Sequence, residues 1–490
     1  MTLKLAPPPD DDDFGPMPPD DPPEGTTGKF TDLWAAEALY CQHGEDLRFV
    51  GGWKRWVAWD GRRWQLDTEA LALHYAAETA RVLATLAIES SDRIKKKMLV
   101  DGVTEDLKDK LEWADKELKA AIGYQSSRKL AAMLTCATHL REFATHHERF
   151  DADPMLLNCK NGIVRLDDGR FFPHLRSDLI TMLAPVEYDP RAQCPTWDAF
   201  LERMQPDIHM RLYLQRLMGY SITGLASEHM MAFHYGTGAN GKGTFLNTIS
   251  AVVGEYARRA HPRLIFRSPN GDRHLTERAS LFRARLVTCS EASEAMSFDE
   301  STMKDLVSTD RVVARRMRED QWEFDPTHTL HVWGNEKPIV RATDNGFWRR
   351  MQLIPWLVQL EVHEWIRGFE SRLVQEEGPG ILRWLVDGAL EWHRIGLEPP
   401  ETVRLATQEY RRASDTGGLF LTACVRDPEF ITTKKAFRAA YETWCAEQGY
   451  EPLGARRMAE VLRRHGIQET TARTGSTVAH AWRGIRLLTE

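Results

Sequence analysis

The sequence predicts a multidomain α/β protein with an α-rich N-terminal domain, a central domain around a parallel sheet, and a small C-terminal module of helices and a hairpin. At 490 residues, the chain exceeds the length over which a single hydrophobic core keeps growing. Residues 228–357 alternate short apolar segments with helical ones, which is the pattern of parallel strands joined by helices. The regions on both sides show mainly the apolar spacing of amphipathic helices.

The composition indicates a protein that works in aqueous solution. Apolar residues make up 42% of the chain and charged residues 28%, as in ordinary globular proteins. No apolar run approaches the roughly 18–20 residues that cross a bilayer, and the first residues lack the apolar segment of a secretion signal. The seven cysteines are scattered without CxxC pairs, which suits reduced thiols. We therefore expect a cytoplasmic protein without a membrane partner.

Residues 1–28 are expected to form a disordered acidic tail, because they are rich in Pro and Asp and hold few side chains that could pack. Their seven acids and one lysine give a net charge of −6, which leaves the rest of the chain close to neutral within the total of −7. A near-neutral body does not exclude DNA binding, since positive charge can be concentrated on one surface. A solubilising role and a partner-binding role both stay open for the tail.

An α-rich N-terminal domain is predicted over residues 29–205. Aromatic and polar residues alternate over 49–67 around Asp60-Gly61, which is typical of a hairpin. Residues 69–148 show helical apolar spacing with few helix breakers. Short strands are expected again over 157–174, around an Asn-Gly pair and an Asp-Gly pair.

The central domain, predicted over residues 206–400, contains a strand, a glycine-rich loop and a helix in that order. Met230–Tyr235 is a short apolar strand, and helical spacing begins again at 244. Between them the spacing Gly-x4-Gly-Lys matches a Walker A phosphate-binding loop in the context that it requires. Glycines let backbone amides approach phosphate, and Lys242 would neutralise the β- and γ-phosphates of ATP. The predicted nucleotide-binding residues are Gly236, Gly238, Ala239, Asn240, Gly241, Lys242, Gly243 and Thr244.

The loop departs from the usual pattern at one position. Gly243 follows Lys242 where a Ser or Thr hydroxyl usually ligates Mg²⁺. Either Thr244 supplies the hydroxyl or water fills that coordination position. Adenylate kinases have a similar GKGT ending, so a nucleotide kinase is an alternative interpretation of the loop.

Two polar residues follow later apolar strands of the central domain. One strand ends before Glu291, and another ends before Asn335. Because ligands of α/β sheets bind beyond the carboxyl ends of the strands, both side chains are expected beside the phosphates. Glu291 would hold Mg²⁺ or polarise the attacking water, with Glu294 as the alternative acid. Asn335 would hydrogen-bond the γ-phosphate and the water.

Arg349 and Arg350 precede the next apolar strand. An arginine presented to the γ-phosphate bound by a neighbouring subunit stabilises the negative charge of the transition state and raises the rate by about 10³–10⁵-fold. We favour Arg350 for this role, with Arg349 as the alternative. A structural ion pair is the other interpretation of these arginines.

In this order, the loop, the acid, the amide and the arginines resemble the superfamily 3 helicases, a compact branch of the AAA+ motors. More narrowly, the chain looks like the phage/plasmid and poxvirus primase-helicase family, over residues 45–490. The set of motifs is specific, although each member alone is weak. The segments that carry the resemblance are GTGANGKGTFLN (236–247), RLVTCSE (285–291), MKDLVSTDRVVARRM (303–317), HVWGNEKP (331–338), FWRRMQLIP (347–355), LLNCKNGIVRLDDG (156–169) and CPTWDAFL (194–201).

The resemblance implies a homo-hexameric ring that hydrolyses ATP with Mg²⁺ and moves along single-stranded DNA, in a phage, prophage, satellite or plasmid replicon inside a bacterial host cell. It also implies a β-hairpin in the channel, and alternating residues around a polar tip over 310–326 agree with it. Arg316 and Arg318 are the predicted DNA contacts, because arginines on a hairpin follow phosphates without reading sequence. The paired-acid and His site of a fused primase is not found, so we expect priming by a separate partner.

Residues 415–490 are predicted to form a winged helix-turn-helix module. Three helices near 418–426, 433–447 and 454–465 precede a strand–turn–strand around Gly475. Basic groups outnumber acids by ten to six from residue 431 on, which suits the phosphates of an origin duplex. A protein interface is the alternative use of such a module. The predicted DNA contacts on the third helix are Arg456, Arg457, Arg463 and Arg464.

Two other functions compete with a helicase. An ATP-controlled, origin-binding replication initiator would bind a specific duplex through residues 415–490 and displace little DNA. A nucleotide kinase would need a lid and no basic hairpin, and single-stranded DNA would not stimulate its use of ATP. For the helicase, Lys242→Ala is expected to abolish hydrolysis and leave the fold intact, on the assumption that this loop lysine faces solvent.

Overall fold

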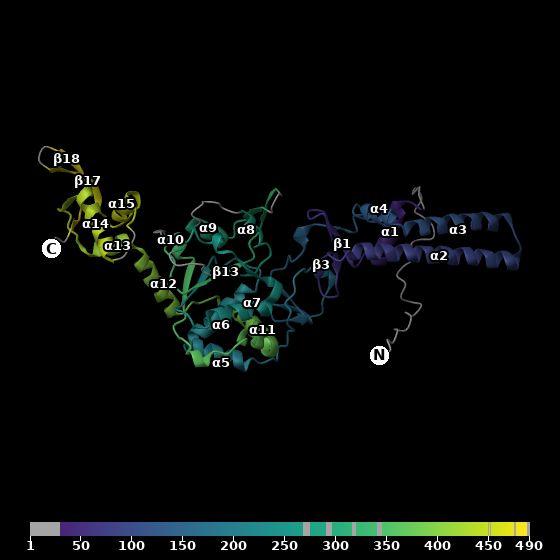
Figure 1. The fold of residues 1–490 in the computed structure, drawn as a ribbon, viewed down its shortest axis with the longest axis horizontal. Coiled ribbons are helices and arrows are strands. Elements are labelled where there is room, and N and C mark those ends of the chain that lie inside the picture. The colour runs from purple at the N-terminus through teal and green to yellow at the C-terminus, as the bar shows by residue number, and fades with distance from the viewer. Residues whose placement is uncertain are drawn as a thin grey trace. The chain divides into compact units, whose positions relative to one another are not determined.

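The computed structural model describes residues 30–267, 275–290, 296–315, 320–340, 345–448, 450, 452–474 and 477–487. They form a mixed α/β structure with a helical N-terminal region and a parallel sheet (Figure 1). The chain divides into two compact units. The first comprises Met1–Asp153 with Asn161–Ile163 and Phe172–Leu183, and the second comprises Pro154–Lys160, Val164–Phe171 and Ala184–Glu490. Three short strands, β5 (Leu156–Cys159), β6 (Gly162–Arg165) and β7 (Phe171–Phe172), lie where the division runs.

The first unit combines a small sheet of strand order β3-β2-β1-β4 with a group of helices. The sheet is antiparallel except for the β1–β4 pair. Trp59 of β2 lies opposite Trp64 of β3 across the turn at Asp60-Gly61, so the predicted hairpin is confirmed. Buried apolar side chains from the helices and the sheet, such as Leu39 and Phe143, form its core. The elements are α1 (Asp32–His43), β1 (Leu47–Val50), β2 (Arg55–Trp59), β3 (Trp64–Leu66), α2 (Leu71–Asp101), α3 (Glu105–Tyr124), α4 (Ser127–Ala137) and β4 (Ala144–Thr145).

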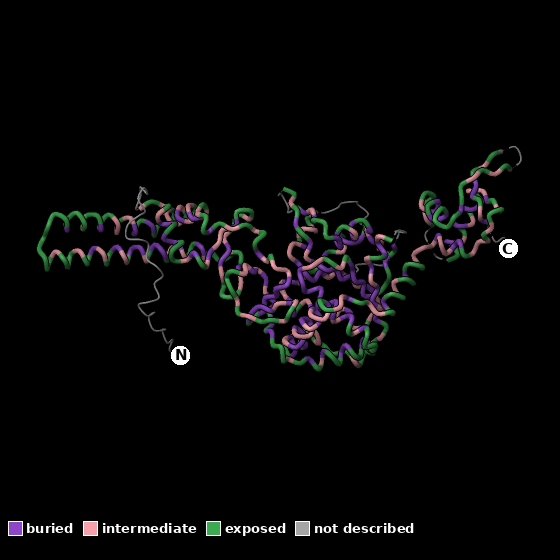
Figure 2. Tube along the Cα trace, turned by 180° about the vertical axis from the view of Figure 1, so that it is seen from behind, coloured by how far each residue is buried: buried purple, intermediate pink, exposed green. Residues whose placement is uncertain are grey.

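Helices α2 and α3 pack side by side as a long hairpin. The 31 residues of α2 extend over about 46 Å. Its buried face consists mostly of small residues such as Ala76, Ala80 and Ala87, which let the partner helix approach closely. Burial ends before the turn, where Leu99 and Val100 are 86% and 83% exposed (Figure 2).

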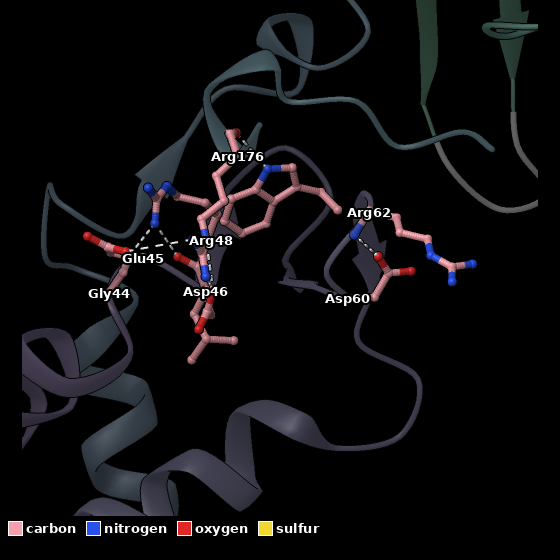
Figure 3. Close-up of polar contacts among 9 residues, drawn as sticks. Gly44, Glu45, Asp46, Arg48, Asp60, Arg62 and Arg176 are labelled. Atoms are coloured by element: carbon pink, nitrogen blue, oxygen red, sulfur yellow. Dashed lines mark hydrogen bonds and ion pairs between the residues drawn. The ribbon is translucent and has the colours of Figure 1, made fainter. Parts of the chain in front are cut away.

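An ion-pair cluster holds residues 172–183 against the sheet of the first unit (Figure 3). The Nε and Nη2 atoms of Arg176 donate to the Asp46 carboxylate at 2.8 and 2.7 Å. The Arg176 carbonyl accepts from Trp64 Nε1 at 3.0 Å, and the Arg48 guanidinium lies 5.1 Å from the centroid of the Trp64 ring. Because these charges contact partners inside the unit, the cluster stabilises the fold.

The second unit is built on a five-stranded sheet of order β14-β8-β13-β10-β9, in which all neighbouring strands are parallel. Its central strands are largely buried on both faces, and Phe233, Val332 and Leu353 are at most 1% exposed, as expected for a parallel sheet that helices cover. The elements are α5 (Pro195–Met204), α6 (Ile208–Ser221), β8 (Met231–Tyr235), α7 (Lys242–Val253), β9 (Ala257–Arg259), α8 (Leu275–Ala279), β10 (Leu286–Ser290), α9 (Glu300–Leu306), β11 (Val312–Arg315), β12 (Gln321–Phe324), β13 (Thr329–Gly334), α10 (Asn345–Trp348), β14 (Met351–Pro355), α11 (Phe369–Ile395) and α12 (Glu401–Ser414).

Helix α5 is held within the second unit. The Glu377 carboxylate of α11 accepts the backbone N–H groups of Thr196 and Trp197, both at 2.9 Å, and so caps the N-terminus of α5. The Trp197 ring stacks on Phe245 of α7 with centroids 5.6 Å apart. Helix α5 thus belongs to the second unit by its contacts, whereas the N-terminal domain predicted from the sequence extends to residue 205. Local helical spacing could not show it, because the partners of α5 are distant in the sequence.

Helices α6 and α11 touch each other backbone to backbone. A Cβ atom on Gly219 would lie 2.1 Å from the backbone nitrogen of Ala389, and one on Gly388 would lie 2.1 Å from the carbonyl oxygen of Gln215. Helix α11 also packs against α7. The two glycines therefore permit the contact that sets the spacing of these helices.

Three helices followed by a hairpin form the C-terminal module. The predicted helices and the two strands, which pair antiparallel, are present, while Gly475 between the strands lies outside the described residues. Phe420, Tyr441, Leu462 and Trp482 lie in its core. Among the described residues of the whole chain, none of the helices has the length and apolar character to span a bilayer. The elements of the module are α13 (Thr416–Thr422), β15 (Cys424–Val425), β16 (Ile431–Thr433), α14 (Lys434–Gln448), α15 (Ala455–Arg464), β17 (Gln468–Thr474), β18 (Thr477–Arg483) and β19 (Arg486–Leu487).

Candidate functional site

The glycine-rich loop follows the carboxyl end of β8, and helix α7 begins at its end. Gly241 precedes the first helical residue at φ 72°, a left-handed conformation that glycine adopts without strain. A Cβ atom there would also lie 2.9 Å from Cε2 of Phe200. Residues after β14 hold the loop from outside: Leu360 N donates to Ala239 O, and Gln359 Nε2 donates to Thr237 Oγ1, both at 2.8 Å.

Lys242 points into the loop. Its Nζ donates to Gly236 O at 2.6 Å, to Asn240 Oδ1 at 2.7 Å and to Asn335 Oδ1 at 3.3 Å. The side chain is only 2% exposed, and desolvation lowers the pKa of its ammonium to about 8. Since the three accepting oxygens are neutral, an anion at the loop would stabilise the charged form. The assumption that Lys242 faces solvent is wrong, because the closed loop covers it.

Asn335 directly follows β13, the neighbour of β8 in the sheet. The structure therefore brings two predicted site residues, Lys242 and Asn335, into hydrogen-bond distance. Thr244 is half-buried in the first turn of α7. A Cβ atom on Gly243 would contact the Trp333 ring at 3.8 Å, so the residue after the lysine adjoins the strand that carries the amide.

Several predicted residues lie outside the described part of the chain. These are the acids Glu291 and Glu294 and the hairpin arginines Arg316 and Arg318. The last described residue before the acids, Ser290, ends β10 and lies opposite Trp333 of β13. The strands on either side of the hairpin tip, β11 and β12, pair antiparallel with Val312 opposite Phe324.

Arg350 lies at the amino-terminal ends of the parallel strands, whereas the glycine-rich loop lies at their carboxyl ends. Arg350 directly precedes β14, whose Met351 lies opposite Met231 and whose Pro355 lies opposite Tyr235. The length of the strand, about 3.3 Å per residue, therefore separates Arg350 from the loop of its own chain. Its Nη1 donates to Gly346 O at 2.8 Å, and its Nε is buried and has no hydrogen-bond partner among the residues that the structure describes. Arg349 beside it is exposed.

A buried row of polar side chains crosses the sheet beneath the loop. Trp356 Nε1 donates to His234 Nδ1 at 3.1 Å, and His234 Nε2 lies 3.1 Å from His331 Nδ1. His331 Nε2 lies 2.8 Å from Ser221 Oγ, which donates to Leu217 O at 2.7 Å. Both histidines are fully buried. No sequence pattern indicated this row, because its members lie on different elements that are distant in the chain.

Burial controls the charge of these histidines. Desolvation lowers the pKa of His331 to about 3, and it holds the pKa of His234 well below the ordinary range, with smaller contributions from His331 and Lys242. The unfolded chain therefore binds more protons than the folded one between pH 6.5 and these values. Their contribution to stability is complete above pH 6.5 and is lost as the pH falls.

We expect the free energy of unfolding to fall by about 2 kcal/mol for each of the two histidines between pH 7.5 and pH 5. Urea unfolding followed by fluorescence at pH 7.5, 6 and 5 measures this. His331→Gln should remove about half of this pH dependence, because His234 still contributes its share. His480→Gln at an exposed position should retain all of it. Equal dependence in all three proteins would contradict the assignment.

The predicted DNA-contacting arginines of α15 differ in their surroundings. The Arg456 side chain is 96% exposed, with Nε 3.8 Å from a Glu460 oxygen. Arg463 pairs with Glu469 at 3.2 Å, a carboxylate that Lys434 also contacts at 2.7 Å. Arg457 is half-buried and Arg464 is exposed. Arg456 is thus freer than Arg463 to meet an external phosphate.

Two family models match the chain. Residues 36–206 match the family described as "D5 N terminal like", and residues 234–350 match a "Family of unknown function (DUF5906)". The second match contains the loop, Asn335 and both arginines of the pair 349–350.

Similar curated proteins come from large DNA viruses. The "Putative helicase L207/L206" of Acanthamoeba polyphaga mimivirus is 23% identical over 286 residues, which are 54% of this chain and 30% of that protein. The "Putative primase C962R" of African swine fever virus is 24% identical over 217 residues, 42% of this chain and 22% of that protein. The "Putative helicase 022R" of Frog virus 3 is 23% identical over 265 residues, 50% of this chain and 27% of that protein. The chain thus spans less than a third of the length of these relatives.

Among solved structures, the apo A form of the NrS-1 C-terminal region has the same fold. The TM-score is 0.52 at 10% sequence identity, and the match covers 94% of this chain and 100% of that one. With the D5-type match, the viral relatives support a relationship to a primase-helicase-like family.

Proposed function

We propose that this chain, as a relative of primase-helicase-like proteins, is an ATP-dependent replicative DNA helicase of superfamily 3 and AAA+ type. In this proposal it hydrolyses ATP at the subunit interfaces of a homo-hexameric ring and translocates on single-stranded DNA of a phage, prophage, satellite or plasmid. One observation carries the proposal. Lys242 Nζ lies 3.3 Å from Asn335 Oδ1 at the carboxyl ends of adjacent parallel strands, while Arg350 lies at the opposite sheet edge.

The glycine-rich loop is proposed to bind the phosphates of ATP. Its backbone amides and the start of α7 favour negative charge. Lys242 is suited to this role because, among the described residues, its ammonium donates to neutral oxygens, and phosphate oxygens would compensate its charge better. Mg²⁺ would neutralise the β- and γ-phosphates, with Thr244 and Glu291 as its proposed protein ligands.

The remaining groups are proposed to act on the γ-phosphate. The Asn335 amide orients the attacking water without adding charge, and Glu291 or Glu294 polarises it. Arg350, or Arg349 beside it, reaches the phosphate of the adjoining subunit and stabilises the charge that develops there. The position of Arg350 supports action on a neighbouring subunit, since the length of β14 separates it from its own loop.

Two basic regions are proposed to bind DNA. The hairpin of β11 and β12 would carry Arg316 and Arg318 to single-stranded DNA. The C-terminal module, in which the paired strands β17 and β18 follow three helices, is proposed to act as a winged helix, with Arg456 and Arg457 of α15 contacting duplex phosphates. A separate primase or replisome partner is proposed to supply primers.

The proposal predicts strand displacement on a forked duplex with ATP and none with a non-hydrolysable analogue. Single-stranded DNA should raise ATP hydrolysis several-fold, because strand binding and hydrolysis are coupled in a translocating motor. Gel separation of the displaced strand and release of inorganic phosphate measure the two effects. ATP hydrolysis without displacement, together with tight binding of one duplex sequence, would instead identify an origin-binding initiator. Phosphate transfer to a nucleoside monophosphate would identify a kinase.

A further inference from the structure

Trp356 connects the buried histidine row to the glycine-rich loop. It is 0% exposed, and each of its polar groups contacts the strand–loop segment. Its backbone N–H donates to Tyr235 O at 2.7 Å, and its carbonyl accepts from Asn240 Nδ2 at 3.2 Å. Its indole Nε1 donates to His234 Nδ1 at 3.1 Å. Trp356 therefore contacts the last two residues of β8 and, through Asn240, the middle of the loop.

The hydrogen bonds of the row can run in one direction. An indole N–H can only donate, so His234 accepts at Nδ1 and carries its proton on Nε2. That proton is donated to His331 Nδ1, which leaves the His331 proton on Nε2, directed at Ser221 Oγ. Ser221 then donates to Leu217 O. Every donor and acceptor in the row is satisfied when both rings are neutral, and a further proton on either Nδ1 atom would face a donor.

The row joins the elements that carry the proposed catalytic groups. His234 lies on β8 two residues before the loop, and His331 lies on β13 four residues before Asn335. Through Trp356, the row reaches Asn240, whose Oδ1 accepts from Lys242 Nζ at 2.7 Å. Apolar side chains could fill the same space, but they would permit several packings, whereas directed hydrogen bonds select one.

We propose that Trp356, His234 and His331 are positioning residues that fix the glycine-rich loop relative to Asn335 and so set the place of Lys242 Nζ. This inference rests on the proposed function for its effect on catalysis. The positioning itself concerns the loop and can be measured without ATP.

Trp356→Phe tests the inference by removing the indole donor while keeping an aromatic ring. Hydrogen exchange followed by mass spectrometry should show several-fold faster exchange over residues 236–244. The kcat of ATP hydrolysis should fall about 10- to 100-fold, as for a displaced catalytic group, with the Kd for a non-hydrolysable ATP analogue nearly unchanged. The matched control is Trp392→Phe on α11, which removes the hydrogen bond from Trp392 Nε1 to Glu228 Oε1 at 2.7 Å. It should change neither the exchange over residues 236–244 nor kcat.

Ser221→Ala decides the question if Trp356→Phe unfolds the protein. It removes the hydroxyl that accepts from His331 Nε2 and donates to Leu217 O. The ¹⁵N chemical shift of His331 Nε2 should therefore change, because its proton loses its acceptor, and exchange in the loop should become faster. Ser414→Ala, which removes a similar bond to a carbonyl four residues earlier, should do neither. Wild-type exchange over 236–244 in Trp356→Phe, or in Ser221→Ala where the first variant does not fold, would overturn the inference. If the wild-type protein hydrolyses no ATP, the proposed function fails, while the exchange data still decide the positioning role.

Discussion

Replacing Lys242 by Met is expected to lower the kcat of ATP hydrolysis by at least about 10²–10³-fold, the typical loss when one preorganised charge-stabilising donor is removed. Methionine keeps the length of the buried stem but leaves Gly236 O and Asn240 Oδ1 without the donor that they now share. Unfolding should therefore also become easier, by about 1–3 kcal/mol. Phosphate release and urea unfolding on the same preparations measure the two effects.

This expectation revises the simpler one of an inactive protein with an unchanged fold. Lys242→Ala would add a cavity to the lost hydrogen bonds, so Met separates chemistry from packing better. Lys160→Met on the surface is the matched control and should leave both quantities unchanged. Hydrolysis by Lys242→Met within tenfold of the wild-type rate would show that the loop does not act on phosphate as proposed.

Arg350→Ala is expected to reduce ATP hydrolysis by about 10³-fold or more, because the charge that develops on the transferred phosphate loses its stabilising partner. Because Arg350 lies at the end of the strands away from its own loop, we expect a second subunit with an intact arginine to complement the defect. In mixed rings, a loop from an Arg350→Ala subunit can meet the arginine of a Lys242→Met subunit. With equal, random mixing, about a quarter of the interfaces in a closed ring combine both intact groups.

Mixing the two inactive proteins should therefore restore up to about a quarter of the wild-type rate, provided that subunits exchange and interfaces act independently. Phosphate release at fixed total protein, across a series of mixing ratios, should peak near equal amounts. Arg349→Ala in the same mixtures decides which arginine of the pair acts. A flat line at the background rate, with subunit exchange demonstrated separately, would place the essential arginine within its own chain's site or outside the site.

Local sequence patterns predicted the parts of the site that one segment forms. The glycine spacing located the loop and the helix that begins at Lys242, since strand, turn and helix are adjacent in the chain. The approach of Asn335 to Lys242 was also predictable, because the carboxyl ends of parallel strands meet at one edge. The predicted acids and hairpin arginines lie outside the described residues, so their placement stays a prediction; they are Glu291, Glu294, Arg316 and Arg318.

Sequence patterns did not reveal features that depend on which strands are neighbours. Trp356 contacts the loop because β14 lies beside β8, although more than a hundred residues separate them. The histidines in β8 and β13 look like isolated polar residues in apolar strands until the pairing joins them. The burial of Lys242 and the membership of α5 in the second unit likewise depend on contacts between distant segments.

The close contact between α6 and α11 makes two chemically inert residues hard to replace. Even a methyl group at Gly219 or Gly388 would overlap the opposing main chain, so alanine there must push the helices apart. Helix α11 lies against the helix that starts at Lys242, so that shift would be transmitted toward the ammonium group. Natural variation at these two positions should therefore be as restricted as in the loop itself, for mechanical reasons.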